Sequence, residues 1–176
     1  MSTILLSDLA LALLLLGASA FDLRQRRIPN RLLALGLLVA LILQLASGHP
    51  AALVTSYLPG FAVGLIMFLP LYLAGGMAAG DVKLMATVGA FVGPSLVCQC
   101  SLATYCYGGL MALVIVLARR RSRAAFANVR ALMLPIVMRL GGVRLAPEAA
   151  PISVGGMPYA LAISAGTLTV MVLRHS

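Results

Sequence analysis

The chain has 176 residues, of which 62% are hydrophobic and only 10% charged. This composition, with a mean hydropathy of +1.07, excludes an ordinary soluble domain and indicates an integral membrane protein. A net charge of +9 would suggest a nucleic-acid partner in a soluble protein. Here the basic residues cluster beside apolar segments, as in cytoplasmic loops, so we expect no nucleic acid, a lipid bilayer as the environment, and anionic headgroups near the basic clusters.

Taken in chain order, the apolar segments predict one all-α membrane domain over residues 1–176, a bundle of about six transmembrane helices. We place the helices at residues 4–21, 30–47, 53–74, 82–92, 95–118 and 152–173. Basic residues follow the first segment and do not precede it, which favours a retained helix with its N-terminus outside over a signal peptide. Asn30, after Pro29, is expected to be the N-cap of the second helix.

Two stretches depart from this regular pattern. At 1.5 Å per residue, residues 82–92 form a helix of roughly 16 Å, about half of the hydrocarbon core. Asp81, just before it, is therefore expected below the membrane surface unless the bilayer thins locally. Residues 119–151 are the least regular part, and within them residues 131–138 predict an interfacial helix.

The chain has only four acidic residues, and two of them are expected at similar depth. Asp22 closes the first helix and Asp81 opens the fourth, both on the cytoplasmic side. Asp8 lies near the opposite face, and Glu148 lies in the loop before the last helix. Because acids at membrane depth are costly and usually functional, we predict that Asp22 and Asp81 form a pair.

Two carboxylates in one site cannot easily both ionise, so one keeps a proton. The ionised aspartate can then take a proton from water that attacks an amide carbonyl, while the protonated one stabilises the oxyanion. Such hydrolysis needs no nucleophilic serine or cysteine. His49 and His175 lie in a loop and at the C-terminus, and the cysteines fall on one apolar segment, so we expect no metal and no cofactor.

The same residues also have purely structural interpretations. Asp22 could be a surface carboxylate solvated beside the following arginines, and Asp81 could pair with Lys83 for assembly. Lys83 could bias the pair toward ionisation, hold a substrate carbonyl, or only extend to the headgroups. The glycines before Asp81, namely Gly75, Gly76 and Gly80, could admit an extended substrate backbone or serve only close helix packing.

Three motifs, in this order, resemble those of the type IV prepilin peptidases. The stretch from Asp22 to Ile28-Pro29-Asn30 is similar to their first aspartate motif, and Gly80-Asp81-Val82-Lys83-Leu84 to the second, GxGD. Met157-Pro158-Tyr159-Ala160 resembles the proline-tyrosine segment that opens their last helix. The resemblance spans about residues 10–170. Ala78 stands where the GxGD motif has its first glycine, a change that a negative φ angle would allow.

This resemblance implies an aspartic endopeptidase of the bacterial cytoplasmic (inner) membrane that removes the basic leader of prepilins on the cytoplasmic side. Asp22 and Asp81 take the catalytic assignments. The residues expected to bind substrate or support the site are Gly76, Gly80, Lys83, Asn30 and Pro158. Larger members carry an insertion with paired CxxC zinc ligands and methylate the new N-terminus. Lacking both insertion and CxxC, the chain looks like the short form of tight-adherence (Flp) pilus systems, without methyltransferase activity.

Two further functions remain open from the residues alone. A small transporter or proton-coupled channel could use Asp81 and Lys83 as a proton relay, although the chain shows no internal repeat and few polar residues inside its helices. A non-enzymatic pilus assembly partner could bind pilin helices in the membrane. In that case Asp22 would be dispensable, whereas the peptidase requires both prepilin substrates and both aspartates.

Overall fold

The computed structural model describes residues 2–46, 51–118 and 157–175. The chain divides into two compact units, one formed by residues 1–109 with 158–176 and the other by residues 110–157. Of the second unit, the structure describes only residues 110–118 and 157. The contacts reported below all belong to the first unit. The single membrane domain expected from the sequence stays a prediction.

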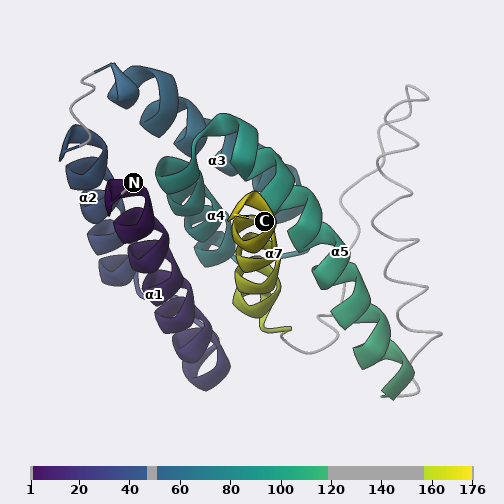
Figure 1. The fold of residues 1–176 in the computed structure, drawn as a ribbon. Helices are drawn as coiled ribbons and strands as arrows, with labels where there is room; N and C mark the ends of the chain where they lie inside the picture. Colours follow the sequence, from purple (N-terminus) through teal and green to yellow (C-terminus); the bar gives the residue numbers. More distant parts are fainter. Residues whose placement is uncertain (1, 47–50, 119–156, 176) are drawn as a thin grey trace, which may run out of the picture. The chain divides into compact units, whose positions relative to one another are not determined.

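All regular elements among the described residues are helical, which confirms the all-α prediction for this part of the chain (Figure 1). The elements are α1 (Ser2–Gln25), α2 (Asn30–Ala46), the π-helical turn η1 (Leu53–Tyr57), α3 (Leu58–Leu73), α4 (Ala79–Val92), α5 (Pro94–Ala118) and α7 (Tyr159–His175). Their ends lie close to the predicted ones, except that the last helix begins at Tyr159. The interfacial helix predicted at residues 131–138 lies outside the described residues.

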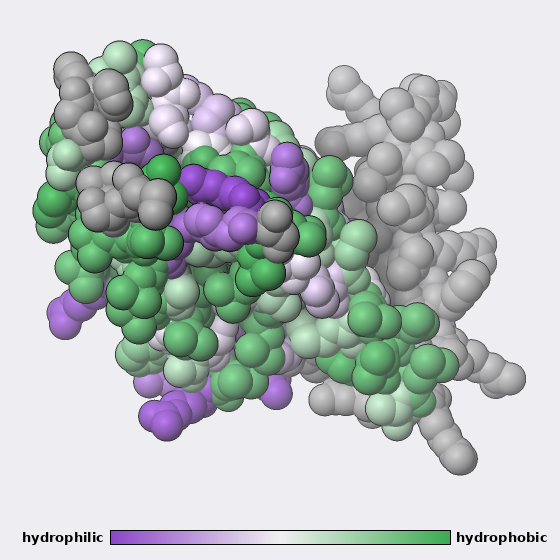
Figure 2. All heavy atoms as spheres, in the orientation of Figure 1, coloured by the Kyte–Doolittle hydropathy of each residue, from purple (hydrophilic) through white to green (hydrophobic). Residues whose placement is uncertain are grey.

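Three helical stretches are long and apolar enough to cross a membrane: Ile4–Gln25, Leu53–Leu73 and Pro94–Ile115. Large apolar side chains on their outer surfaces are exposed, among them Leu13 and Leu16 of α1 and Ile66 of α3. Figure 2 shows the resulting surface, which is mainly hydrophobic on the face drawn. These features fit a membrane protein, whereas six spans and an outside N-terminus stay predictions.

The short helix α4 is the centre of the first unit. Its side chains are buried on nearly all sides, and it contacts α1, α2, α3 and α7. It begins at Ala79 rather than at residue 82, so its 14 residues extend for about 21 Å. This is still less than the roughly 20 residues that a spanning helix needs. Asp81 therefore lies inside the first turn of a buried helix.

Helices α3 and α4 approach each other through glycines. A Cβ atom on Gly60 would lie 2.0 Å from the carbonyl oxygen of Gly89, and one on Gly64 would lie 2.5 Å from that of Met85. Gly60 and Gly64 are four residues apart, so they share one face of α3 and form a GxxxG contact of the kind that lets membrane helices pack closely. Our sequence analysis did not single out this pair.

The turn between α3 and α4 has a defined backbone conformation and leads into the first turn of α4. Gly75 has φ +74°, and its N–H donates to the Tyr72 carbonyl at 2.9 Å. The Gly76 N–H donates to the Leu71 carbonyl at 2.8 Å. These two bonds form a Schellman motif, in which a left-handed glycine ends a helix. The contacts described for Gly76 are thus those of a residue that ends a helix. Its role in binding substrate stays a prediction.

Gly75→Ala is expected to destabilise the protein by about 1 kcal/mol, because alanine at a positive φ angle is strained. Steric clash does not contribute, since nothing lies within 4 Å of a Cβ at Gly75. Gly109→Ala is the matched control: it also has open space around its Cβ but lies within α5. Thermal unfolding in detergent should show a lower Tm only for Gly75→Ala; equal Tm values would contradict the assignment.

Candidate active site

The structure brings Asp22 and Asp81 together. Asp22 lies near the end of α1 and is 8% exposed, and Asp81 lies in the first turn of α4 and is 6% exposed. The carboxylates are close enough for the charge of Asp22 to act on Asp81. Two buried acids therefore lie within range of each other's charge, although 59 positions separate them in the chain.

Asp22 is held by the start of α7. Its Oδ2 accepts a hydrogen bond from the Ala160 N–H at 3.1 Å. The N-terminus of a helix carries partial positive charge and unpaired N–H groups, so it stabilises a carboxylate placed there. Asp22 has no ion pair with an arginine among the described residues. The alternative of a solvated surface carboxylate is therefore wrong, because the α1–α7 contact buries it.

Asp81 caps the N-terminus of its own helix. Its Oδ2 accepts from the Ala78 N–H at 3.2 Å, and its own N–H donates to the Ala78 carbonyl at 3.1 Å. Ala78 has φ −82° and ψ 153°, an extended conformation open to any L residue. The alanine in place of the motif's first glycine is thus accommodated without backbone strain.

Lys83 is bonded to Asn30 and forms no described ion pair with Asp81. Its Nζ donates to Asn30 Oδ1 at 3.2 Å, and both side chains are exposed. The prediction that Asn30 caps α2 is wrong: the helix already includes Asn30, and the Pro29 carbonyl accepts from the N–H groups of the next turn. The Asn30 side chain does not cap α2. Its amide oxygen instead accepts the hydrogen bond from Lys83 and so links α2 to α4.

The two aspartate motifs also pack against each other directly. A Cβ on Gly80 would meet the side chain of Ile28 at 3.4 Å, an ordinary van der Waals distance, so the loop before α2 lies beside the start of α4. Together with the Lys83–Asn30 bond, this contact fixes the first turn of α4. Gly80 and Lys83 thus lie beside Asp81 in the first turns of α4, and their supporting role stays a prediction.

An aromatic layer borders the carboxylates. Tyr159 of α7 meets Phe68 of α3 edge to face, with ring centroids 6.4 Å apart, and Phe68 stacks on Tyr105 of α5 at 5.1 Å. Tyr159 is near enough to Asp81 for the two to interact electrostatically. Pro158 precedes this tyrosine, and its carbonyl accepts from the Leu161 N–H in the first turn of α7. Apart from Pro158 and Tyr159, the sequence analysis missed this layer.

Two serines join α1 to α7. Ser19 lies about one turn before Asp22 on α1, and Ser164 lies about one turn after Ala160 on α7. Ser19 Oγ and Ser164 Oγ are 2.8 Å apart, and Ser164 Oγ also donates to the Leu15 carbonyl. Hydroxyl groups often link membrane helices in this way. Sequence analysis missed both serines, whose only signal is a small polar residue within an apolar segment. Their bonds hold α7 where its first turn reaches Asp22.

No cluster of three or more His, Cys, Asp or Glu side chains that could hold a metal is present in the described ranges. Cys98 is half-buried, Cys100 buried and Cys106 exposed, each as a free thiol.

These features define a helical membrane protein in which the end of one helix and the beginnings of two others bring two buried aspartates together. The chain belongs to the type IV leader peptidase family, whose sequence model matches residues 9–117. The family predicted from the motifs is thus confirmed. The match contains both aspartate motifs and ends before Pro158. No curated protein and no solved structure matches the chain.

Proposed function

We propose that the protein is an aspartic endopeptidase of the bacterial cytoplasmic membrane that cleaves the basic leader from Flp-like type IV prepilins. The observation that carries the proposal is the meeting of the buried carboxylates of Asp22 and Asp81 in a member of a leader peptidase family. Acid–base chemistry by a carboxylate pair requires such proximity.

In the proposed mechanism the pair shares one proton. The ionised carboxylate takes a proton from a water molecule as the water oxygen attacks the scissile carbonyl carbon. The protonated carboxylate gives its proton to the carbonyl oxygen, which yields a neutral gem-diol. The gem-diol collapses as one carboxylate removes a hydroxyl proton and the other protonates the leaving nitrogen. The C–N bond then breaks, and the pair returns to its starting protonation.

Charge supports placing the site at the cytoplasmic face. Asp22 and Asp81 lie at one end of the first unit. The exposed cations at that end are Arg24, Arg26, Arg27, Arg31 and Lys83. Basic residues flank membrane helices on the cytoplasmic side. The two aspartates lie at this same end, where the basic part of a prepilin leader would remain before export.

The connection between α1 and α2 supports the short form of the enzyme. Only residues 26–29 separate the two helices, so no room exists there for an inserted zinc-binding region. We therefore propose peptidase activity without methyltransferase activity, with prepilins as substrates and pilus assembly proteins as further partners.

The decisive test is leader removal by the purified protein in proteoliposomes, with small prepilins from the same genome as substrates. Mass spectrometry should show the mature pilin and the released leader when no other protein is present. Ion flux that depends on Asp81 without any processing would instead establish the transporter. Pilin binding without cleavage, unaffected by loss of Asp22, would establish the assembly partner.

A further inference from the structure

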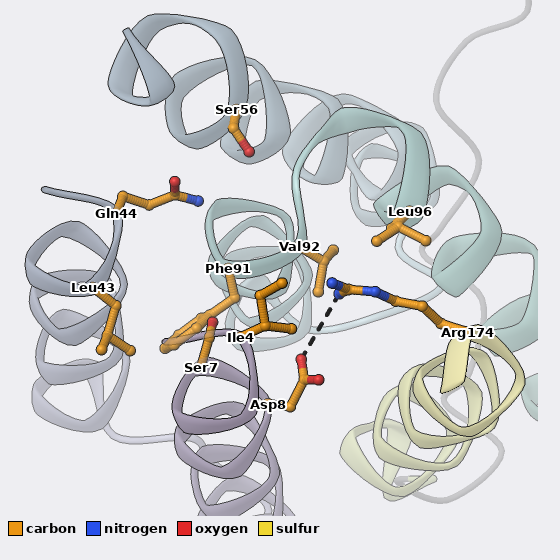
Figure 3. Close-up of a pocket in the computed structure, with 10 residues that line it drawn as sticks. All are labelled: Ile4, Ser7, Asp8, Leu43, Gln44, Ser56, Phe91, Val92, Leu96 and Arg174. Atoms are coloured by element: carbon orange, nitrogen blue, oxygen red, sulfur yellow. Dashed lines mark ion pairs between the residues drawn. The ribbon is translucent and has the colours of Figure 1, made fainter. Parts of the chain in front are cut away.

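A polar cavity lies at the end of the first unit opposite to the aspartate pair (Figure 3). Its volume is about 220 Å³, and its polar lining comes from Ser7, Asp8, Gln44, Ser56 and Arg174. On α1, Asp8 is about 21 Å along the helix axis from Asp22. The cavity is thus separate from the proposed active site. Figure 2 shows hydrophilic atoms gathered in the region where both chain termini lie in Figure 1.

The cavity presents one cation beside one anion. His175 Nε2 is 2.7 Å from Asp8 Oδ2, which satisfies that oxygen. Arg174 Nη1 is 3.9 Å from Asp8 Oδ1, too far for a hydrogen bond. Side-chain exposure is 15% for Asp8 and 33% for Arg174. The guanidinium therefore keeps donors for a ligand, and Asp8 Oδ1 keeps acceptor capacity, at a partly buried position.

The surrounding residues shape this site for a ligand with both polar and apolar parts. Phe91, Val92 and Leu96 supply apolar walls next to the charged pair. Ser56 belongs to the π-helical turn η1, an irregularity that is frequent at functional sites. A Cβ on Gly93 would come within 2.8 Å of Ser56 Oγ, so the glycine leaves room for this hydroxyl.

We propose that this cavity binds the headgroup of an ethanolamine phospholipid. Arg174 would hold the phosphate through charge-assisted hydrogen bonds, and Asp8 Oδ1 would accept from the primary ammonium. The end of a membrane helix bundle lies at headgroup depth, and the exposed Ile4, Leu5 and Leu9 of α1 provide an apolar surface for acyl chains nearby. Choline lacks the N–H donors that Asp8 would accept, and a glycerol headgroup lacks the cation.

The test uses the full chain purified in detergent and titrated with lipids of identical acyl chains in native mass spectrometry. Phosphatidylethanolamine should bind about tenfold more tightly than phosphatidylcholine or phosphatidylglycerol, the effect of about one charge-assisted hydrogen bond. O-phosphoethanolamine should compete with the lipid, and inorganic phosphate should not. Equal binding of the three lipids, or equal competition by inorganic phosphate, would overturn the proposal.

Two variants connect the preference to the cavity. Asp8→Asn should reduce the preference for phosphatidylethanolamine to within about twofold, because Asp8 is the residue proposed to contact the ammonium. Arg174→Gln should weaken the binding of all three lipids by about tenfold, because all three carry the phosphate. Arg31→Gln is the matched control, because Arg31 is an exposed arginine at the opposite end of the unit, and it should keep the wild-type preference. If Asp8→Asn fails to fold after losing its tie to α7, the lipid affinity of Arg174→Gln decides. Wild-type affinity for all three lipids in Arg174→Gln would overturn the assignment.

Discussion

Asp81→Asn and Asp22→Asn are each expected to lower the rate of leader cleavage by about 10³-fold or more, because a positioned acid or base contributes roughly 10²–10⁴-fold and the proposed mechanism uses the pair twice. Asparagine keeps the size of the side chain and an oxygen that can accept from the Ala78 or Ala160 N–H. It cannot exchange a proton with water. The measurement is single-turnover cleavage of a prepilin in proteoliposomes.

The double variant and a folding measurement serve as controls for this prediction. If the two aspartates act as one unit, the Asp22→Asn/Asp81→Asn variant should be hardly slower than either single variant. Each variant should keep a Tm near that of the wild type, since neither loses its backbone hydrogen bond. Cleavage within tenfold of wild type in either single variant would remove that residue from the mechanism.

Gly60→Ala is expected to cause a large loss of stability in the α3–α4 contact, as is Gly89→Ala, whose Cβ would lie equally close to the Gly60 carbonyl oxygen. The new Cβ would lie 2.0 Å from the Gly89 carbonyl oxygen, so the two helices must separate. Overpacking of this kind costs roughly 1–3 kcal/mol. Because α4 carries Asp81, a displacement of about 1 Å could also lower cleavage by up to about 10²-fold. Tm and cleavage rate should therefore fall together.

Gly109→Ala is again the matched control, since its Cβ would meet nothing within 4 Å on a helix. It should not lower Tm, because alanine favours the helix more than glycine does, and it should leave cleavage near wild type. Gly64→Ala, whose Cβ would approach the Met85 carbonyl oxygen at 2.5 Å, should resemble Gly60→Ala. A Gly60→Ala protein as stable as Gly109→Ala would show that the two helices are not in close contact.

Much of the fold follows from local pattern. Apolar runs bounded by glycine, proline and basic residues predicted each described helix to within a few residues at most ends, because a helix in lipid must satisfy its own backbone. The same pattern placed Asp22 and Asp81 at one depth, since each lies at the boundary of an apolar segment. The family assignment from the aspartate motifs is confirmed for the same reason: those motifs are contiguous in the chain.

Local pattern failed where the partner of a side chain lies far along the chain. Asparagine is a preferred N-cap residue, yet the amide oxygen of Asn30 accepts a hydrogen bond from Lys83. Asp22 follows the pattern of a solvated acid before arginines, yet the Ala160 N–H binds it. Capping and pairing preferences describe only hydrogen bonds between neighbours within a turn or two. They do not include hydrogen-bonding groups from distant parts of the chain that compete for the same side chain.

The sequence by itself determined the membrane class, the helical segments, the family and the two acids, because hydropathy and motif spacing are local properties. Only the tertiary structure decided that the first turn of α7 binds Asp22, that glycines bring α3 against α4, and that a charged cavity forms at the opposite end. Each of these features joins residues from separate helices. Their formation depends on close packing of whole helices, which fixes positions that no single segment specifies.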